Sequence, residues 1–316
     1  MIKHVRTMLG SSLRVLALLI GITWLVSSIL LPAWLSTQHL FTILRAVSIL
    51  CMVSFGQMIV ILSGEIDLSV GGTIYFVTVI LPLLTRSQIP VWAIIPFGLI
   101  LGVLVGTVNG IFVGKLKIPS IVQTLGMHLI LMGLCWLIGG SIHRRCDPFL
   151  ITLVSMKIGF IPLIFFILLA VSIFLFFILR NSSLGWKIRA VGSNPEASRL
   201  TGLNLVSLRI TIFIISGILA GAAGVMYLGW IGRSAYGAGN ILVEEYMLQS
   251  IAAVIIGGTT FKGGRGGVPQ TMLGAFTLVT IFSLLRILGM EPRSRYMIMG
   301  LIMLIFVAAH FRARRR

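Results

Sequence analysis

Residues 91–113 read VWAIIPFGLILGVLVGTVNGIFV, an apolar run without a single charged side chain. A helix of about 20 apolar residues crosses the roughly 30 Å hydrocarbon core of a bilayer. Similar runs recur along the chain, without the apolar/polar alternation of membrane-barrel strands. Because lipid offers no hydrogen-bond partners to the backbone, helices are the remaining way to span it. The sequence therefore predicts a bundle of transmembrane helices.

Composition supports this fold class. The chain has 316 residues, of which 58% are hydrophobic and only 10% charged, with a mean hydropathy of +1.09; soluble proteins carry about 25% charged residues. We predict an all-α, polytopic integral membrane protein with about ten transmembrane helices, eight to ten being compatible with the pattern. The predicted spans are approximately 15–35, 41–62, 70–85, 91–113, 119–139, 160–179, 208–230, 244–258, 269–289 and 296–310.

The positive charges predict the topology. The net charge is +18, and most Lys and Arg residues fall in loops that would be cytoplasmic if the N-terminus is cytoplasmic, in agreement with the positive-inside rule. This distribution explains the charge better than nucleic-acid binding does. The terminal FRARRR places the C-terminus inside as well, whereas residues 143–145 are the exception that falls outside. The first apolar run, 15–35, is too long for a signal peptide and is predicted to be an uncleaved span.

The longest cytoplasmic loop, residues 180–207, interrupts an otherwise single transmembrane domain covering 1–316. Within it, Ser193 or Asn194 can cap a helix, Pro195 suits its first turn, and Glu196 complements its positive end. The following residues through Arg199 give about two turns, and Gly202 can end them. This short helix either docks a cytoplasmic partner or is a surface helix without a role.

Glycine recurs every fourth residue in LGVLVGTVNGIFVG, the stretch 101–114. Such a stripe allows another helix to approach closely in lipid. We therefore predict a helix-packing face formed by Gly102, Gly106, Gly110 and Gly114, and a second one in SGILAGAAG around Gly217, Gly221 and Gly224. Asn109 adjoins the first stripe and could either hydrogen-bond across helices or line a transport path.

The glycine-rich segment 257–267, GGTTFKGGRGG, does not match the phosphate-binding pattern G-x-x-x-x-G-K-[ST]. We predict tight turns there and no nucleotide hydrolysis by this chain. Cys51, Cys135 and Cys146 show no paired spacing, and no Ser/His or metal-ligand constellation is visible. The sequence thus predicts no catalytic residue, no metal and no cofactor.

Residues 63–72, SGEIDLSVGG, place Glu65 and Asp67 among glycines between two apolar runs. An acid at the centre of a membrane helix costs about 2.5–3.5 kcal/mol, and the glycines weaken a continuous helix by roughly 1 kcal/mol each. The pattern indicates either a helix break in a polar, protein-lined place or a polar turn near the cytoplasmic surface. On a helix the two acids would be about 200° apart, whereas in an extended break they would face one side.

Several stretches, taken together, resemble one family. SGEIDLSVGG is similar to the S-G-G-I-D-L-S-V-G signature of permeases from sugar-type ABC importers, the ribose/xylose/arabinose class. KIPSIVQTLGM, AVGSNPEASRLTGLNL and IAAVIIGGTTFKGGRGG resemble further stretches of these permeases, in the same order, from about residue 41 to 300. The chain departs from the pattern at Glu65, where the family frequently has glycine, and at Pro269. A third departure lies before Ile251, where the family often has an acid. Here MLQS occupies that stretch, and Glu244 and Glu245 lie slightly earlier.

The resemblance implies a permease that forms the translocation path for a sugar in the bacterial inner membrane. It implies three protein partners: a cytoplasmic ATPase, an external substrate-binding protein and a second permease copy, identical or related. Membrane lipid surrounds the complex, and no nucleic acid is involved. Residues matching the signature and the glycine stripe, Glu65, Asp67, Ser69 and Asn109, would lie along the path; Asn194, Pro195, Glu196 and Arg199 would couple it to the ATPase.

Two alternatives stay open at this point. Glu65 and Asp67 could carry protons in an ion-coupled secondary transporter. An ABC permease could instead carry branched-chain amino acids or nucleosides. The capped loop helix favours the ABC importer over ion coupling.

Overall fold

The computed structural model describes residues 17–18, 20–29, 31–84, 91–139, 145–236, 240–291, 294–295, 297–298, 300–301 and 304. Within them a short 3-10 helix, η1 (Pro32–Leu35), precedes α2, and a two-stranded antiparallel hairpin, β1 (Lys157–Ile158) and β2 (Ile161–Pro162), precedes α7. The labelled α-helices are α2 (Thr37–Leu62), α3 (Val70–Leu84), α4 (Val91–Gly114), α5 (Ser120–Gly139), α6 (Pro148–Ser155), α7 (Leu163–Asn181), α8 (Ser183–Ser193), α9 (Pro195–Leu200), α10 (Leu205–Ile231), α11 (Asn240–Ile256) and α12 (Val268–Ile287).

The helices confirm an α-helical membrane protein. Within the described residues, six are long and apolar enough to cross a bilayer: α2, α4, α5, α7, α10 and α12. Three shorter apolar helices, Ile20–Ile29, α3 and α11, coincide with predicted spans as well. The last predicted span, 296–310, lies mostly outside the described residues.

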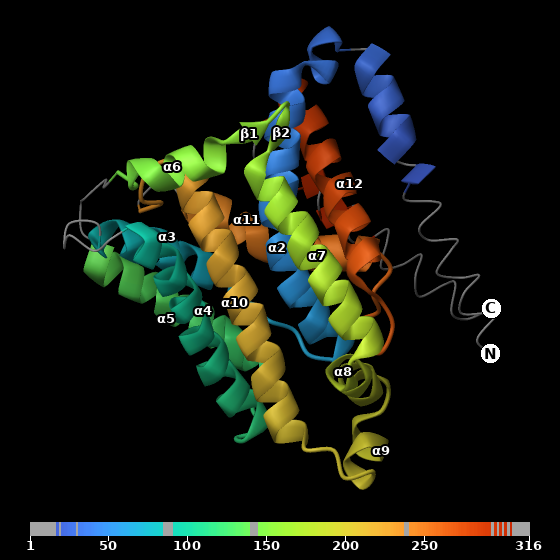
Figure 1. The fold of residues 1–316 in the computed structure, drawn as a ribbon. Helices are drawn as coiled ribbons and strands as arrows, with labels where there is room; N and C mark the ends of the chain where they lie inside the picture. The colour runs from blue at the N-terminus through green and yellow to red at the C-terminus, as the bar shows by residue number, and fades with distance from the viewer. Residues whose placement is uncertain are drawn as a thin grey trace.

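Helix α2 forms the centre of the bundle (Figure 1). Its residues from Val47 to Leu62 are buried without interruption. A helix that is apolar on all sides is stable only when other helices or lipid surround it. Here α7, α10, α11 and α12 pack around α2, which explains why this helix is buried on all sides from Val47 onward.

Helix α10 packs most extensively against α4. At Gly102 and Gly106 the backbone of α10 comes so close that a Cβ would overlap the carbonyl oxygens of Gly217 and Phe213. On α10, a Cβ at Gly221 would likewise come too close to the carbonyl oxygen of Gly98, although the approach there is less tight. Gly102, Gly106, Gly217 and Gly221 therefore lie where the backbones of α4 and α10 approach closely, and Gly114 has somewhat more room than the other three members of its stripe.

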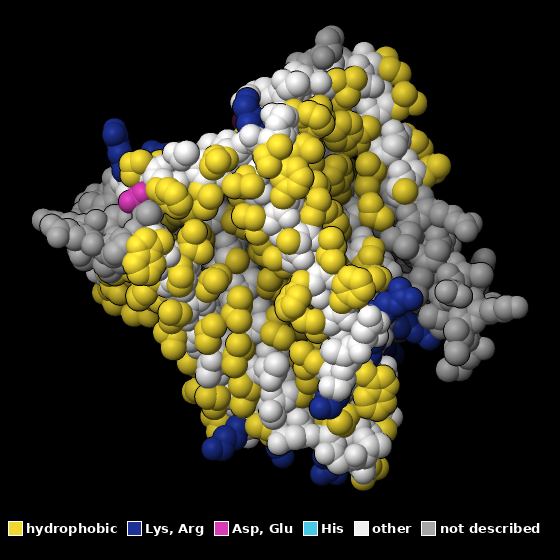
Figure 2. All heavy atoms as spheres, viewed as in Figure 1, with side chains coloured by type: hydrophobic (Ala, Val, Ile, Leu, Met, Phe, Trp, Pro, Cys, Tyr) yellow, Lys and Arg dark blue, Asp and Glu magenta, His cyan; other side chains and the backbone are white. Residues whose placement is uncertain are grey.

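The bundle has two distinct ends (Figure 1). We call the end with α6 and the β-hairpin the α6 end, and the opposite end, where α8 and α9 project, the α9 end. Hydrophobic side chains cover the middle of the face in Figure 2, and Lys and Arg side chains lie toward its ends. Leu137 on α5 is 83% exposed and Phe174 on α7 is 63% exposed. Such exposure is unfavourable in water but suits a lipid-facing surface.

Candidate functional site

The signature stretch between α2 and α3 is a true break in helical structure. Its backbone is held by the first turns of α5: Ile66 donates its N–H to the Ser120 hydroxyl at 3.2 Å, and Leu68 donates to the Thr124 hydroxyl at 2.9 Å. A break within a membrane protein is tolerated where protein satisfies the freed backbone groups. Helix α5 supplies these partners.

Asp67 fastens the break to α10. Its side chain is 2% exposed. One carboxylate oxygen accepts from the backbone N–H and the hydroxyl of Ser69, at 2.9 and 2.6 Å, and the other accepts from the Ser216 hydroxyl at 2.8 Å. A buried carboxylate is costly unless hydrogen bonds replace its water, and three donors do so here. The bond to the Ser69 N–H also organises the residues that lead into α3.

Asn109 extends this network to α4. Its amide donates to the Ser69 hydroxyl at 2.8 Å, and its oxygen accepts from Gln123 of α5 at 3.4 Å. Asn109 is 0% exposed and Ser69 is 1% exposed. Of the two roles considered for Asn109, the bond across helices is therefore observed, and in this conformation its side chain is enclosed by protein.

Glu65 lies apart from Asp67 and has a different partner. Its carboxylate pairs with the Arg209 guanidinium near the start of α10 at 2.9 Å, in a partly exposed position. Both acids thus contact α10 at different heights, Glu65 through Arg209 and Asp67 through Ser216. They do not share a ligand, and together they bind the break to α10.

The helix predicted inside the long loop is confirmed as α9. Asn194 is its cap and accepts from the N–H of Ala197 at 3.0 Å, and Pro195 is its first residue. Glu196 and Arg199 form an ion pair at 2.7 Å, with side chains 68% and 66% exposed. The apolar Leu200 is 78% exposed beside them. This helix therefore presents both charged and apolar side chains at the α9 end.

Helix α8, which the sequence reasoning did not identify, links α9 to the bundle. At Gly192 a Cβ would overlap the carbonyl oxygen of Leu62, the last residue of α2. The same carbonyl accepts from the N–H of Gly264 in the glycine-rich segment at 2.9 Å. We call this meeting of α8, the end of α2 and the glycine-rich segment the α8 junction. The predicted tight turns are confirmed by positive φ angles at Gly263 and Gly264.

Arg189 adds a polar bond to the α8 junction. Its guanidinium donates to the carbonyl oxygen of Gly266 at 3.0 Å. Burial lowers the pKa of Arg189, but the ordinary pKa of arginine is above 12, so the group stays charged near neutral pH. A charge-assisted bond from α8 therefore holds the glycine-rich segment that leads into α12.

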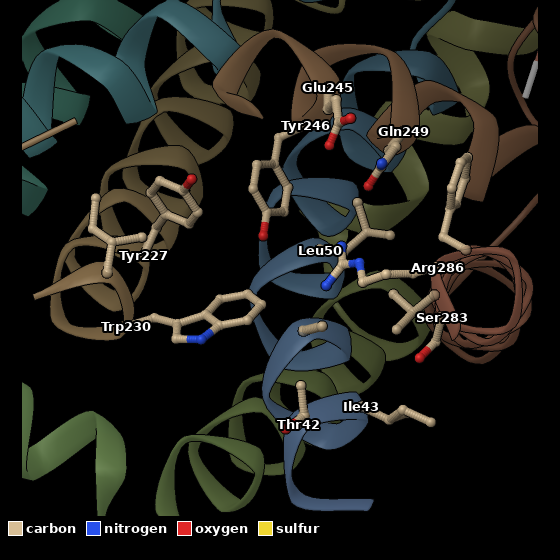
Figure 3. A pocket seen from close by; sticks show the side chains of 14 residues that line it. Thr42, Ile43, Leu50, Tyr227, Trp230, Glu245, Tyr246, Gln249, Ser283 and Arg286 are labelled. Atoms are coloured by element: carbon tan, nitrogen blue, oxygen red, sulfur yellow. The ribbon is translucent and has the colours of Figure 1, made fainter. Parts of the chain in front are cut away.

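A cavity of about 220 Å³ opens between α2, α10, α11 and α12 (Figure 3). Its polar and aromatic lining includes Trp230 and Tyr227 of α10, Glu245, Tyr246 and Gln249 of α11, and Arg286 of α12. The Arg286 side chain extends from α12 toward the middle of the view, where the rings of Trp230 and Tyr246 approach from other sides. The cavity lies in the half of the bundle nearer the α6 end, since α10 ends beside Cys146, just before α6.

Comparison with known proteins decides the family. The profile of the family described as "Branched-chain amino acid transport system / permease component" matches residues 39–307. The chain belongs to this family of permeases. The permease is thus a multi-pass protein of the inner membrane that serves as a transport subunit of an ABC importer.

Among its relatives, the ribose import permease RbsC of Haemophilus influenzae is 29% identical, over 90% of this chain and 88% of the relative. The fructose import permease FrcC of Rhizobium meliloti is 32% identical, over 84% and 76%. The probable ABC transporter permease YphD of Escherichia coli is 32% identical, over 93% and 88%. No solved structure matches the chain.

The structure of the permease groups the residues singled out in the sequence into two sets. Asp67, Ser69 and Asn109 form one buried network, whereas Glu65 lies apart from it and pairs with Arg209. The α9 residues form a separate exposed set at the α9 end. The residues of the cavity were not predicted. Glu245 is the sequence feature that could have indicated them, because it is one of only seven acids in the chain and lies in an apolar helix. Acids within membrane helices mark functional positions.

The Asp67 network predicts a difference between two substitutions. Asp67→Ala leaves the Ser69 N–H and two buried hydroxyls without their acceptor, at about 1–3 kcal/mol for each unsatisfied group. Asp67→Asn keeps one acceptor oxygen, and the Ser216 hydroxyl can rotate to accept from the new amide. We expect a large loss of thermal stability for Asp67→Ala and a small one for Asp67→Asn in the purified permease. Equal stability of the Ala variant and the native protein would contradict this role.

Proposed function

We propose that the permease forms the translocation path for a monosaccharide or related small carbohydrate, driven by a separate ATPase subunit. Two of its relatives are import permeases for ribose and fructose, and four stretches of its sequence resemble sugar-type permeases. In this proposal the chain does not itself hydrolyse nucleotide. The whole chain, 1–316, is one transmembrane domain, and 180–207 is its cytoplasmic coupling loop.

The proposed topology has about ten spans and both termini in the cytoplasm, so the α9 end is cytoplasmic and the α6 end is external. The basic residues of the loop that contains α8 and α9 support this orientation. An ATPase would then dock on α9, and an external binding protein would deliver the sugar at the α6 end. A second permease copy, identical or related, completes the complex.

The α8 junction is the observation that carries the proposed coupling. Helix α9, with Asn194, Pro195, Glu196 and Arg199, follows α8 directly, and α8 contacts Leu62 at the point where α2 ends and the break begins. A displacement of α9 by the ATPase would therefore act on Leu62 and then on the break that holds Glu65, Asp67 and Ser69, with Asn109 opposite. In this proposal the break network lies along the path and rearranges as access alternates between the two sides.

Transport assays test the energy source. We expect the permease, reconstituted with its ATPase and its binding protein, to take up sugar only with ATP and to continue in the presence of an uncoupler. Sugar accumulation by the permease alone, driven by an ion gradient, would contradict the proposal and favour a secondary transporter. Uptake of leucine but not sugar under the same conditions would retain the ABC mechanism and exclude the proposed cargo.

A charge exchange on α9 tests the docking site. Glu196→Arg combined with Arg199→Glu keeps an ion pair but reverses the charge at each position. An exposed pair contributes only about 0–1 kcal/mol, so the stability of the permease should not change. Binding of the ATPase should weaken by about tenfold or more, because like charges would face each other across the interface.

The matched control is Lys157→Glu, a charge reversal at an exposed position of β1, at the opposite end of the bundle. It should leave ATPase binding unchanged. Native ATPase affinity and native uptake in the exchanged α9 variant would remove α9 from the coupling mechanism.

A further inference from the structure

The cavity between α2, α10, α11 and α12 has the chemistry of a site for a small polar molecule. Its volume of about 220 Å³ is below the roughly 300–1,000 Å³ of pockets for drug-sized ligands. Glu245 and Arg286 contribute one charge of each sign, so the lining is neutral overall. Thr42, Gln249 and Ser283 add groups that can both donate and accept hydrogen bonds.

The aromatic wall of the cavity is fixed in place before any ligand arrives. The Arg45 guanidinium lies 5.1 Å from the centre of the Trp230 ring. Tyr227 contacts both Trp230 and Tyr246 edge to face, with ring centres 6.3 and 5.4 Å apart. A preorganised wall lowers the entropic cost of binding, and flat aromatic rings present apolar faces that suit the C–H face of a sugar ring.

Buried polar groups continue from the cavity toward the α9 end. Gln57 lies on the same face of α2 as the cavity-lining Leu50, within about 20° at 100° per residue. It is 0% exposed, and neither its amide oxygen nor its amide nitrogen has a hydrogen-bond partner among the described residues. Ser54, also on this face, and Thr271 of α12 are likewise fully buried with hydroxyls that lack a described partner.

Such groups need an explanation, because an unsatisfied buried polar group costs about 1–3 kcal/mol. Thr271 lies on the same face of α12 as the cavity-lining Phe282, again within about 20°. The polar groups of α2 and α12 therefore follow the cavity-lining faces of both helices toward the glycine-rich segment. A solute with several hydroxyls can satisfy them in turn, whereas an aliphatic side chain would leave them unpaired.

We propose that this cavity binds a neutral, polyhydroxylated molecule the size of a monosaccharide, and that Gln57 and Thr271 contact it on its way toward the α9 end. This inference rests on the proposed sugar transport and assigns it a binding site in the permease itself. The site is distinct from the Asp67 network, which is satisfied internally. Trp230, Glu245 and Arg286 are the residues that would determine which solute binds.

Protection of an introduced thiol tests the site directly. Ser283→Cys in the full-length permease, in lipid nanodiscs, places a thiol in the cavity, while the three native cysteines are buried. We measure its reaction with a small methanethiosulfonate reagent in the presence of D-ribose, D-fructose or L-leucine. A sugar at about three times its Kd should slow the reaction about fourfold, the factor 1 + [L]/Kd. Ser155→Cys, at the exposed end of α6, is the control whose rate should not change.

Each outcome decides the proposal. Protection by a sugar and not by leucine supports it. Protection by leucine alone indicates a zwitterion site and overturns it, as does protection by none of the three. Because no ATPase or binding protein is present, this result is independent of the transport assays. Sugar uptake by the complete importer without protection of this thiol would retain the proposed function and reject the site.

Matched substitutions assign the contacts. Gln57→Leu should raise the sugar concentration needed to protect the Ser283→Cys thiol by about tenfold, which is the scale of one lost hydrogen bond. Trp230→Leu should raise it as well, because the flat aromatic wall is lost. Their controls are Gln38→Leu, at an exposed position of the same helix as Gln57, and Trp136→Leu, on the exposed surface of α5. Equal protection in Gln57→Leu and Gln38→Leu, with both proteins folded, would exclude the Gln57 contact.

Discussion

Replacing Gly102 and Gly106 together by alanine is expected to prevent the permease from forming a stable bundle. Each new Cβ would overlap a backbone carbonyl of α10, and a backbone atom cannot turn away as a flexible side chain can. Overpacking in a core typically costs about 1–3 kcal/mol per site and occasionally more. Two sites in the most extensive helix pair would therefore remove much of the roughly 5–15 kcal/mol by which a protein is stable.

The measurement is the yield of monodisperse permease after detergent extraction, together with its thermal unfolding. Gly126→Ala combined with Gly133→Ala is the matched control, because both glycines lie within α5 and a Cβ there meets nothing within 4 Å. This control should be as stable as the native protein, since alanine favours helices more than glycine does. If both double variants behaved alike, close packing of α4 on α10 would not explain the glycine stripe.

Gly192→Ala is expected to separate ATP hydrolysis from transport. The added methyl group would overlap the carbonyl oxygen of Leu62, so α8 has to move away from the end of α2. The movement also disturbs the bond from Gly264 to the same carbonyl. The bundle itself should stay folded, because the extensive packing of α4 on α10 does not involve the contact between Gly192 and Leu62.

We expect uptake by the reconstituted importer to fall by about tenfold or more, which corresponds to an increase of about 1.4 kcal/mol in the activation free energy of transport. ATP hydrolysis by the attached ATPase should continue. Ser183→Ala, at the exposed first position of α8, is the control that should transport normally. Full uptake by Gly192→Ala would show that the α8 junction does not transmit the motion of α9.

Local features of the site were predictable because neighbouring residues determine them. The α9 helix follows from Asn194 as its cap and Pro195 in its first turn, and the break follows from acids and glycines between two apolar runs. The glycine spacing predicted close packing but not its partner. That partner is α10, about 110 residues further along the chain, and periodicity on one helix carries no information about which helix faces it.

The cavity could not be predicted because its residues are distant in the sequence. Trp230, Glu245 and Arg286 come from three helices, and each has an unremarkable local context apart from its charge or size. Helix α8 was missed as well, since residues 183–193 combine basic, small and apolar residues without a clear stop signal before Asn194. Its position became evident only from the contact of Gly192 with Leu62.

The sequence by itself determined that the chain is a helical membrane protein, where its helix break lies and where its exposed loop helix begins. Composition, apolar length and capping residues are sufficient for these features, because each depends on the solvent or on a few neighbouring residues. Only the tertiary structure decided that Asp67 is satisfied by Ser69 and Ser216, that α8 contacts the end of α2, and that four helices together line a cavity containing Glu245 and Arg286. These features depend on which surfaces meet across the bundle, and the free energy of that packing is shared among residues far apart in the chain.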